Sequence, residues 1–356
     1  MRIGVMTGGG DCAGLNAAIR AVVLASMIHH DIEVVGILNG YEGLIEHQTM
    51  PLGRQELRGI LRIGGTILGS SNRTNPFKYT DHVTGESVDA SGRAANTVSD
   101  LGLDGLVVIG GDGTLTLSNI FAERYGIPLV GIPKTIDNDV PGTEYSIGFD
   151  TAVSIVAEAI DRLHTTAESH HRVMLVEVMG RTAGWISLFS GVAGGADIVL
   201  IPERRFEFAG VVDAIDRRRQ VGRHFTIATV AEGAMLPSGE RVYRSKSGET
   251  YEWKLGGVCD FLAARLEDMS RQEVRTIVLG HLQRGGIPTA FDRNLASMLG
   301  VRAVQVLADR QGGTLVGWDG HEVTESPISV ASAGPQLVPA NHPLIATADA
   351  LGIYIG

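Results

Sequence analysis

Glycine-rich stretches of this sequence contain charged residues whose types and spacing could carry out chemistry. The first stretch runs from Gly8 to Gly14, and the second from Gly110 to Thr114. Small residues let a backbone approach a ligand closely, and a helix that starts after such a loop points free N–H groups at it, which favours phosphate. In the second stretch Asp112 could hold magnesium, because this cation prefers carboxylate oxygen.

Both stretches also have plainer interpretations. Gly8, Gly10 and Ala13 fit a loose dinucleotide-binding pattern, but the second predicted strand ends near Asn39 and not at the acid that such a site needs. The first stretch could instead be a tight structural turn, and Thr114 could cap the helix that follows it.

A third stretch, from Pro133 to Asp139, carries two carboxylates two residues apart, Asp137 and Asp139. One carboxylate could accept a proton from an attacking hydroxyl, and the other could orient groups or help to hold a metal. Asp and Asn also favour turns, so a turn without chemistry is the alternative.

Basic residues follow further along the chain. Arg181 stands in a Met-Gly-Arg turn, where a planar cation could stabilise the charge on a transferring phosphoryl group. His281 and Arg284 are three residues apart in a glycine-rich turn and could bind a phosphate monoester together. Taken singly, such an arginine is more often a surface residue, and such a histidine more often structural.

Each of these stretches follows a short apolar run, which places it after a predicted strand. Strands are expected at 3–6, 33–38, 106–109, 128–132, 173–178, 225–230 and 276–279, and helices at 15–27, about 114–125, 151–165 and from about 182. This alternation predicts an α/β fold with mostly parallel sheets, whose ligands bind at the carboxyl ends of the strands. Polar stretches at 77–93 and 236–253 are predicted to be surface excursions or hairpins.

Composition limits the class of protein. A chain of 356 residues is expected to form two domains, and a net charge of -10 argues against a general nucleic-acid binder. Because only two cysteines occur, we expect no disulfide framework, and a reducing cytoplasm is favoured. We expect neither a signal peptide nor a membrane span, because the chain opens directly on a strand and has no long apolar run.

The order and spacing of the motifs resemble the phosphofructokinase family over nearly the whole chain. The residues that carry this resemblance are Gly8–Asn16, Gly110–Thr114, Pro133–Asp139, Val176–Arg181 and Val278–Gly286. The resemblance implies phosphorylation of fructose 6-phosphate at its 1-hydroxyl to fructose 1,6-bisphosphate with MgATP, a step of glycolysis.

The resemblance also implies an architecture. Two Rossmann-like three-layer α/β/α domains would bind the donor (residues 1–147 plus about 283–330) and the sugar phosphate (148–282 plus the C-terminal tail). The subunits would form a homodimer or homotetramer with shared active sites, with no nucleic-acid or membrane partner.

Roles for single residues follow from the same resemblance. Asp137 would be the base for the 1-hydroxyl with Asp139 beside it, and Thr135 and Arg181 would contact the transferred phosphoryl group. The residues implied on the donor side are Gly10, Arg73, Gly111, Asp112, Gly113, Thr114 and Lys134. Asp112 would be the magnesium ligand.

On the acceptor side the resemblance implies a larger set of ligands. They are Thr135, Asp137, Arg172, Met179, Gly180, Arg181, Glu232, Arg275, His281 and Arg284. Glu232 would bind sugar hydroxyls, and His281 and Arg284 would hold the 6-phosphate. Arg172 and Arg275 would reach the 6-phosphate of a neighbouring subunit.

The phosphoryl donor stays open between ATP and pyrophosphate. ATP users of the family usually have Gly at the positions of Gly113 and Lys134, whereas pyrophosphate users usually have an acid and a Lys there. Gly113 leaves room for the α-phosphate, which favours ATP, and Lys134 is expected to be a flexible cation that could pair with either donor.

Two other functions compete with this interpretation. Kinases of NAD or of lipids share the Gly110–Thr114 motif, but the Lys134–Asp139 run together with His281 and Arg284 speaks against them. A non-enzymatic regulatory chain is disfavoured because every matched catalytic position holds a competent residue.

Overall fold

The chain divides into two compact units, each with its own sheet. The computed structural model describes residues 1–81, 85–247 and 252–356. Unit 1 consists of Met1–Thr135, Asp139–Thr151 and Arg284–Pro335, and unit 2 of Ile136–Asn138, Ala152–Gln283 and Gln336–Gly356. The sequence expectation placed the boundaries after residues 147, 282 and about 330, whereas the units change after residues 151, 283 and 335, and Ile136–Asn138 also belong to unit 2.

Unit 1 is built on a seven-stranded sheet in the order β15-β14-β7-β6-β1-β2-β3. Neighbouring strands are parallel from β14 to β2, and the edge strands β15 and β3 are antiparallel to their neighbours. The strands are β1 (Arg2–Thr7), β2 (Glu33–Ile37), β3 (Thr49–Leu52), β6 (Gly105–Gly110), β7 (Leu129–Pro133), β14 (Thr314–Trp318) and β15 (Val323–Pro327).

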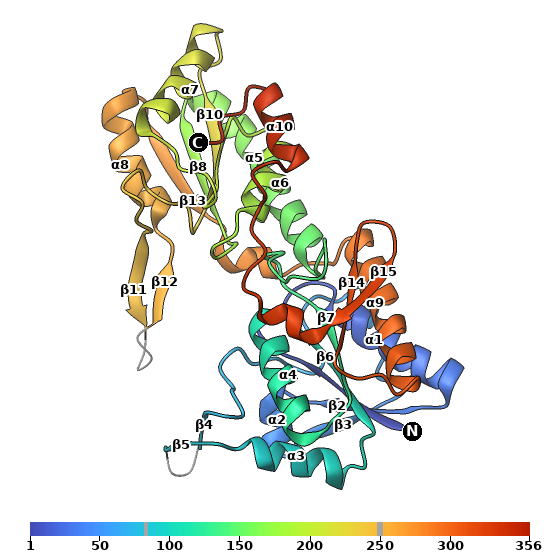
Figure 1. Cartoon of the computed structure of the whole chain (residues 1–356). Helices are drawn as coiled ribbons and strands as arrows, with labels where there is room; N and C mark the ends of the chain where they lie inside the picture. Colours follow the sequence, from blue (N-terminus) through green and yellow to red (C-terminus); the bar gives the residue numbers. More distant parts are fainter. Residues whose placement is uncertain (82–84, 248–251) are drawn as a thin grey trace. The chain divides into compact units, whose positions relative to one another are not determined.

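Helices cover both faces of this sheet (Figure 1). Alternate strand residues such as Met6, Leu106 and Val108 pack with α2 (Tyr41–Ile45), α3 (Ser91–Asp100) and α4 (Asp112–Tyr125) in one buried cluster. The opposite face carries α1 (Leu15–Ala25) and α9 (Ala290–Ala308), which pack against each other. Short 3-10 helices are Ile60–Arg62 and Ile328–Ser332. The result is a three-layer α/β/α unit.

Unit 2 has a fully parallel four-stranded sheet in the order β13-β8-β10-β9. Its strands are β8 (Val173–Val178), β9 (Ile198–Leu200), β10 (Thr226–Ala231) and β13 (Val274–Val278). One face packs against α7 (Phe208–Gln220) and α8 (Val258–Ser270) in a second buried cluster. The other face carries α6 (Trp185–Ala193), with α5 (Phe149–His170) beside it, and α10 (Pro343–Ala350) packs on α6. The predicted fold class is therefore confirmed.

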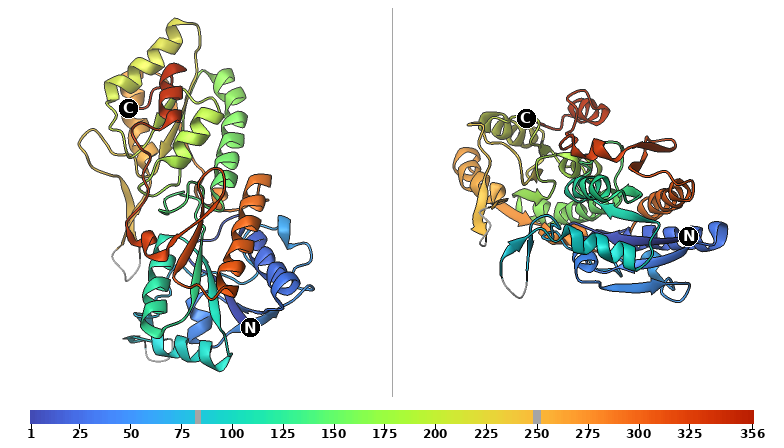
Figure 2. Two further views of the ribbon diagram at one scale, coloured as in Figure 1. Left: turned by 45° about the vertical axis from the view of Figure 1, so that its right-hand side comes forward. Right: turned by 60° about the horizontal axis from the view of Figure 1, so that its bottom comes forward.

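Both polar stretches form hairpins, as expected. They are β4 (Tyr79–Thr80) with β5 (Ser87–Val88), and β11 (Tyr243–Ser247) with β12 (Glu252–Leu255). Both connecting segments, 82–84 and 248–251, lie outside the described residues. In Figures 1 and 2 the β11–β12 hairpin extends away from the four-stranded sheet of unit 2.

Several element boundaries differ from the sequence prediction. The α1 helix ends at Ala25 and continues as one π-helical segment, Ser26–His30. The α6 helix begins at Trp185, after its N-cap Gly184, and not near residue 182, because residues 180–183 form a turn that is closed by a hydrogen bond from Ala183 N–H to the Gly180 carbonyl at 2.9 Å. No helix in the described ranges has both the length and the apolar character needed to cross a bilayer.

A buried carboxylate, Asp292, fastens the start of α5 to α9 within unit 1. It accepts hydrogen bonds from the Gly148 and Thr151 backbone N–H groups at 2.9 and 2.8 Å and from the Thr151 hydroxyl. Burial raises the pKa of Asp292 to about 6, although the hydrogen bonds from Thr151 and Gly148 lower it. This carboxylate thus caps α5 from a helix 140 positions further along the chain.

Asp292 should give the protein a measurable pH dependence of stability. Its raised pKa means that the folded state holds a proton that the unfolded state releases above about pH 4. The free energy of unfolding should therefore fall with rising pH from about 4 to about 6, by at most about 1.4 kcal/mol per pH unit. In Asp292→Asn the free energy of unfolding should lose this dependence on pH. Urea denaturation at several pH values measures the free energy of unfolding of both proteins. Identical slopes in the variant and the wild type would contradict the assignment.

Candidate active site

Three loops gather at the carboxyl ends of the neighbouring strands β1, β6 and β7. The donor loop, Gly8–Gly14, follows β1, and its shape is held by hydrogen bonds from Gly8 N–H to the Ile109 carbonyl and from Gly9 N–H to the Ser71 carbonyl, each 3.0 Å long. The Ser70 hydroxyl donates to the Gly9 carbonyl at 2.6 Å. Arg73, which the sequence assigns to the donor, lies exposed two residues beyond Ser71.

Thr114 explains why two glycines are needed here. A Cβ atom on Gly8 would lie 2.5 Å from the Thr114 Cγ2, and one on Gly110 would lie 2.6 Å from it. Thr114 is the third residue of α4, and the N-cap position of that helix is Gly111. Thr114 therefore spaces the β1 and β6 loops and does not cap the helix, which excludes the plainer interpretation of this residue.

Asp112 and Gly113 open the α4 helix beside these loops. Asp112 is partly exposed, and a Cβ atom on the exposed Gly113 would meet no atom within 4 Å. No group of three or more His, Cys, Asp or Glu side chains suited to a metal occurs within residues 1–81, 85–247 and 252–356. A lone carboxylate still fits magnesium, which commonly takes one or two carboxylates and completes its shell with phosphate oxygen and water.

Lys134 is not the flexible, accessible cation that the sequence suggested. Its side chain is 1% exposed, and its ammonium group donates to the carbonyls of Gly8 at 2.8 Å and Gly10 at 2.6 Å. The expectation was wrong because the sequence does not reveal that the β1 loop closes over the end of β7.

The two carboxylates of the third motif are both buried. Asp137 is 3% exposed and Asp139 is 2% exposed, and Asn138 between them has φ +53°. This loop is fastened by Thr135 N–H, which donates to the Ile147 carbonyl at 3.2 Å, and by the Ser146 hydroxyl, which donates to the Thr135 carbonyl at 2.7 Å. Asparagine adopts the left-handed conformation readily, so Asn138 alone suits an ordinary turn, but the burial of both flanking acids is more than an exposed turn requires.

Within unit 2, Arg181 and Glu232 lie together at the carboxyl ends of β8 and β10. The Arg181 N–H donates to a Glu232 carboxylate oxygen at 3.1 Å, and the Glu232 N–H donates to the Val178 carbonyl at 2.8 Å. A side chain on Gly233 would collide with the Arg181 carbonyl. Arg181 itself has φ +52°, and Gly180 before it has φ +137°.

The turn with His281 joins the same edge of the unit 2 sheet. Gln283, a buried residue that the sequence analysis missed, accepts from Met179 N–H at 3.2 Å and donates to the Gly280 carbonyl at 3.1 Å. Only its position between His281 and Arg284 in the motif could have indicated it. His281 is exposed.

Arg284, by contrast, lies in unit 1 against the donor loop. Its guanidinium donates to the Asp11 carbonyl at 3.1 Å, and a side chain on Gly10 would collide with it. Gly10 thus leaves the space that this guanidinium occupies.

Arg172 and Arg275 lie at the opposite, amino end of the unit 2 strands. Both form ion pairs with Glu273, and Arg172 does so at 2.6 Å. The hydrogen bond from Arg172 is the main reason why the pKa of Glu273 is lowered. Six residues of β8 separate Arg172 from the turn with Arg181, a span on the order of 20 Å. One small ligand cannot contact both ends of this strand.

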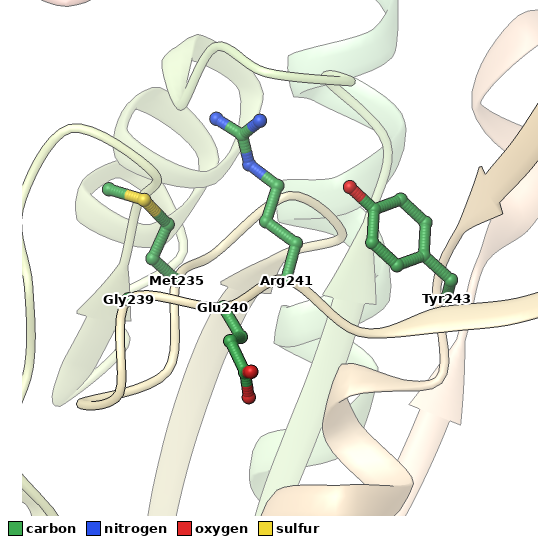
Figure 3. Close-up of a pocket in the computed structure, with 5 residues that line it drawn as sticks. All are labelled: Met235, Gly239, Glu240, Arg241 and Tyr243. Atoms are coloured by element: carbon green, nitrogen blue, oxygen red, sulfur yellow. The ribbon is translucent and has the colours of Figure 1, made fainter.

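A pocket of about 480 Å³ lies on unit 2 near its β11 strand. Figure 3 shows Arg241 and Tyr243 directed to one side of the backbone and Glu240 to the other. The Arg241 Nε donates to the Gly233 carbonyl at 3.3 Å, next to Glu232. Met235 and Gly239 complete the lining, and none of the predicted site residues is part of it.

Comparisons with known proteins show the family of this chain. A family model described as phosphofructokinase matches residues 2–307. The chain is 46% identical to the pyrophosphate–fructose 6-phosphate 1-phosphotransferase of Streptomyces coelicolor over 100% of both chains. It is 43% identical to ATP-dependent 6-phosphofructokinase 2 of Clostridium perfringens over 99% of this chain and 97% of that protein.

Solved structures share the fold. Phosphofructokinase from Saccharomyces cerevisiae superposes with a TM-score of 0.79 at 31% identity, covering 93% of this chain and 45% of that one. Pyrophosphate-dependent phosphofructokinase from Marinobacter aquaeolei superposes with a TM-score of 0.80 at 21% identity, covering 100% of this chain and 89% of that one. At this level of identity the likeness shows the fold alone. The chain belongs to the phosphofructokinase family and is an enzyme of the phosphotransferase class.

Proposed function

We propose that this enzyme phosphorylates fructose 6-phosphate at the 1-hydroxyl to fructose 1,6-bisphosphate, with MgATP as the phosphoryl donor. The observation that carries the proposal is the loop from Lys134 to Asp139. It holds two buried carboxylates directly after β7, and the next two strands on one side of β7, β6 and β1, both end in phosphate-type glycine loops. That combination suits an enzyme that deprotonates an alcohol beside a polyphosphate.

The chain's own residues take distinct roles in this reaction. The Asp137 carboxylate accepts the proton of the 1-hydroxyl, and Asp139 supports the loop beside it. Arg181 and Thr135 contact the migrating phosphoryl group, where the guanidinium stabilises charge on the equatorial oxygens. Met179, Gly180 and Glu232 bind the sugar, in agreement with the hydrogen bond between Glu232 and the Arg181 backbone.

Magnesium and the donor belong with the loops of unit 1. Asp112 is the proposed metal ligand, and the bound ion would supply charge neutralisation on the donor phosphates. The backbone can approach those phosphates at Gly10, Gly111, Gly113 and Thr114. Arg73 lies exposed shortly after Ser70, whose hydroxyl donates to the donor loop. His281 and Arg284 are the proposed ligands of the 6-phosphate.

Gly113 supports ATP as the donor. The space beside its Cα is open, so the larger polyphosphate ester can enter at this point, where a carboxylate would repel it. Burial of Lys134 against backbone carbonyls also weakens the argument that a lysine here signals pyrophosphate through direct contact.

Pyrophosphate is the alternative donor, and one observation favours it. Relatives that are 46% or 47% identical over at least 95% of this chain are named pyrophosphate–fructose 6-phosphate 1-phosphotransferases. Initial rates with fructose 6-phosphate and magnesium, measured with ATP and with pyrophosphate, separate the two proposals. Turnover with pyrophosphate alone would overturn the ATP proposal, and turnover with neither donor would overturn both.

We infer a homodimer or homotetramer that shares active sites, in the cytoplasm. Arg172 and Arg275 stand at the amino ends of β8 and β13, whereas Arg181, Glu232 and His281 follow the carboxyl ends of strands in the same sheet. This separation supports sharing, because the two arginines cannot reach a ligand bound at the carboxyl ends within their own subunit. The two cysteines, Cys12 and Cys259, are buried free thiols, which suits a reducing compartment.

Mixed oligomers test the shared site. Asp137→Asn and Arg275→Ala should each be nearly inactive at low fructose 6-phosphate, whereas co-expressed chains should regain about a quarter of the wild-type activity through sites that receive neither substitution. The control pair, Asp137→Asn with Arg181→Ala, should show no recovery, because both residues come from the same subunit. Absence of recovery in the first pair would contradict the assignment of Arg275 to a neighbour.

A further inference from the structure

Lys134 links three loops at one edge of the unit 1 sheet. Its backbone N–H donates to the Gly110 carbonyl at the end of β6 at 2.9 Å. Its side chain then crosses to the donor loop after β1, where the ammonium meets the Gly8 and Gly10 carbonyls. A Cβ atom on Gly9, whose φ is +80°, would lie 3.4 Å from the Lys134 Nζ. The loop is thus wrapped closely around the ammonium.

The burial of this ammonium limits what it can contact. Removing a charge from water is unfavourable unless hydrogen bonds replace the lost solvent, and two backbone carbonyls at 2.8 and 2.6 Å provide them. A side chain that is 1% exposed reaches a donor in solution only after giving up these bonds. Its position is therefore that of a support behind the donor loop.

The direction of the loop peptides follows from these bonds. The C=O and N–H groups of one trans peptide point in opposite directions. In the peptide between Gly10 and Asp11 the carbonyl faces Lys134, so the Asp11 N–H faces away from it. In the peptide between Gly8 and Gly9 the carbonyl also faces Lys134, and the Gly9 N–H donates to the Ser71 carbonyl. One fixed cation thus sets the orientation of the amide that the loop offers to an anion.

We propose that Lys134 is a positioning residue, which holds the Gly8 and Gly10 carbonyls so that the donor loop presents the Asp11 N–H to the donor phosphates. The inference rests on the proposed function. Because Lys134 acts through the loop and not on one particular donor, its loss affects catalysis with ATP and with pyrophosphate by the same factor. Binding of fructose 6-phosphate is unaffected.

Substitution at this position tests the proposal. Lys134→Met keeps most of the side-chain volume without the charge, and kcat should fall about 10²-fold with every donor that the wild type uses, since small misplacements of binding groups have effects of this size. The KM for fructose 6-phosphate should stay within about threefold. Lys134→Ala should behave alike, and methylammonium or ethylammonium should restore part of its activity by replacing the missing amine. Lys78→Ala, which removes an exposed lysine of the same unit, is the matched control.

The outcomes distinguish the inference from the function on which it rests. A change of more than about tenfold in the ratio of kcat/KM for the two donors would show that Lys134 acts on the donor itself and would overturn the inference. Unchanged kcat in Lys134→Met, or Lys134→Ala that folds but gains nothing from any amine, would overturn it as well. An inactive wild type with both donors would overturn the proposed function and this inference together.

Discussion

Asp137→Asn is expected to lower kcat by about 10²- to 10⁴-fold, because the variant keeps the shape of the side chain but cannot accept the proton of the sugar hydroxyl. The carboxylate is buried in a loop held by Ser146 and Ile147, so the loss should come from chemistry and not from altered packing. Steady-state rates with saturating donor and fructose 6-phosphate measure the effect, and KM for the sugar phosphate should change little.

A matched control makes this result specific. Asp100→Asn removes an exposed carboxylate at the end of α3 in unit 1 and should leave kcat unchanged. Full turnover by Asp137→Asn would rule out this residue as the base, and the neighbouring Asp139 would then be the next candidate.

Gly113→Asp is expected to reduce kcat/KM for ATP by at least about 10²-fold, since like charges brought together in a binding site are repelled by several kcal/mol. The added carboxylate would stand where the α-phosphate of a nucleotide enters, whereas pyrophosphate lacks that ester. The ratio of ATP to pyrophosphate turnover should therefore shift strongly towards pyrophosphate.

The fold should tolerate this substitution. A Cβ atom on Gly113 meets nothing within 4 Å, and an acidic residue in the first turn of α4 favours the helix dipole. Gly113→Ala adds the same Cβ without a charge, so it should change the donor ratio by no more than a few-fold and provides the control. An unchanged donor ratio in Gly113→Asp would show that this residue does not face the nucleotide.

Lys134 changes how the mixed donor signature is interpreted. Its sequence position suggested a cation that meets the donor, but its ammonium is occupied by the backbone of the donor loop. If that role holds, donor choice depends on Gly113 and its surroundings, and Lys134 contributes to catalysis with either donor. The two substitutions therefore test separate features of the same sheet edge.

Local patterns in the sequence were sufficient for the fold class, and they placed the candidate site residues in loops that follow strands. Short apolar runs such as 106–109 and 173–178 predicted strands that the structure confirms as β6 and β8. Because parallel strands present their carboxyl ends at one edge, the loops after them were correctly expected to gather there, and Arg181 and Glu232 do meet. The spacing of Asp137 and Asp139 made them candidates for the base without any knowledge of their burial.

The tertiary structure decided which groups those residues contact. Lys134 meets carbonyls more than 120 positions earlier, Arg284 contacts Asp11, and Asp292 caps a helix that begins at residue 149. Arg172 and Arg275 lie at the other end of the strands from Arg181. Periodicity and turn chemistry depend on neighbours within a few residues, so they determine elements and loops. Contacts between distant segments depend on how sheets and helices pack, and no local pattern encodes which buried charge will meet which backbone group.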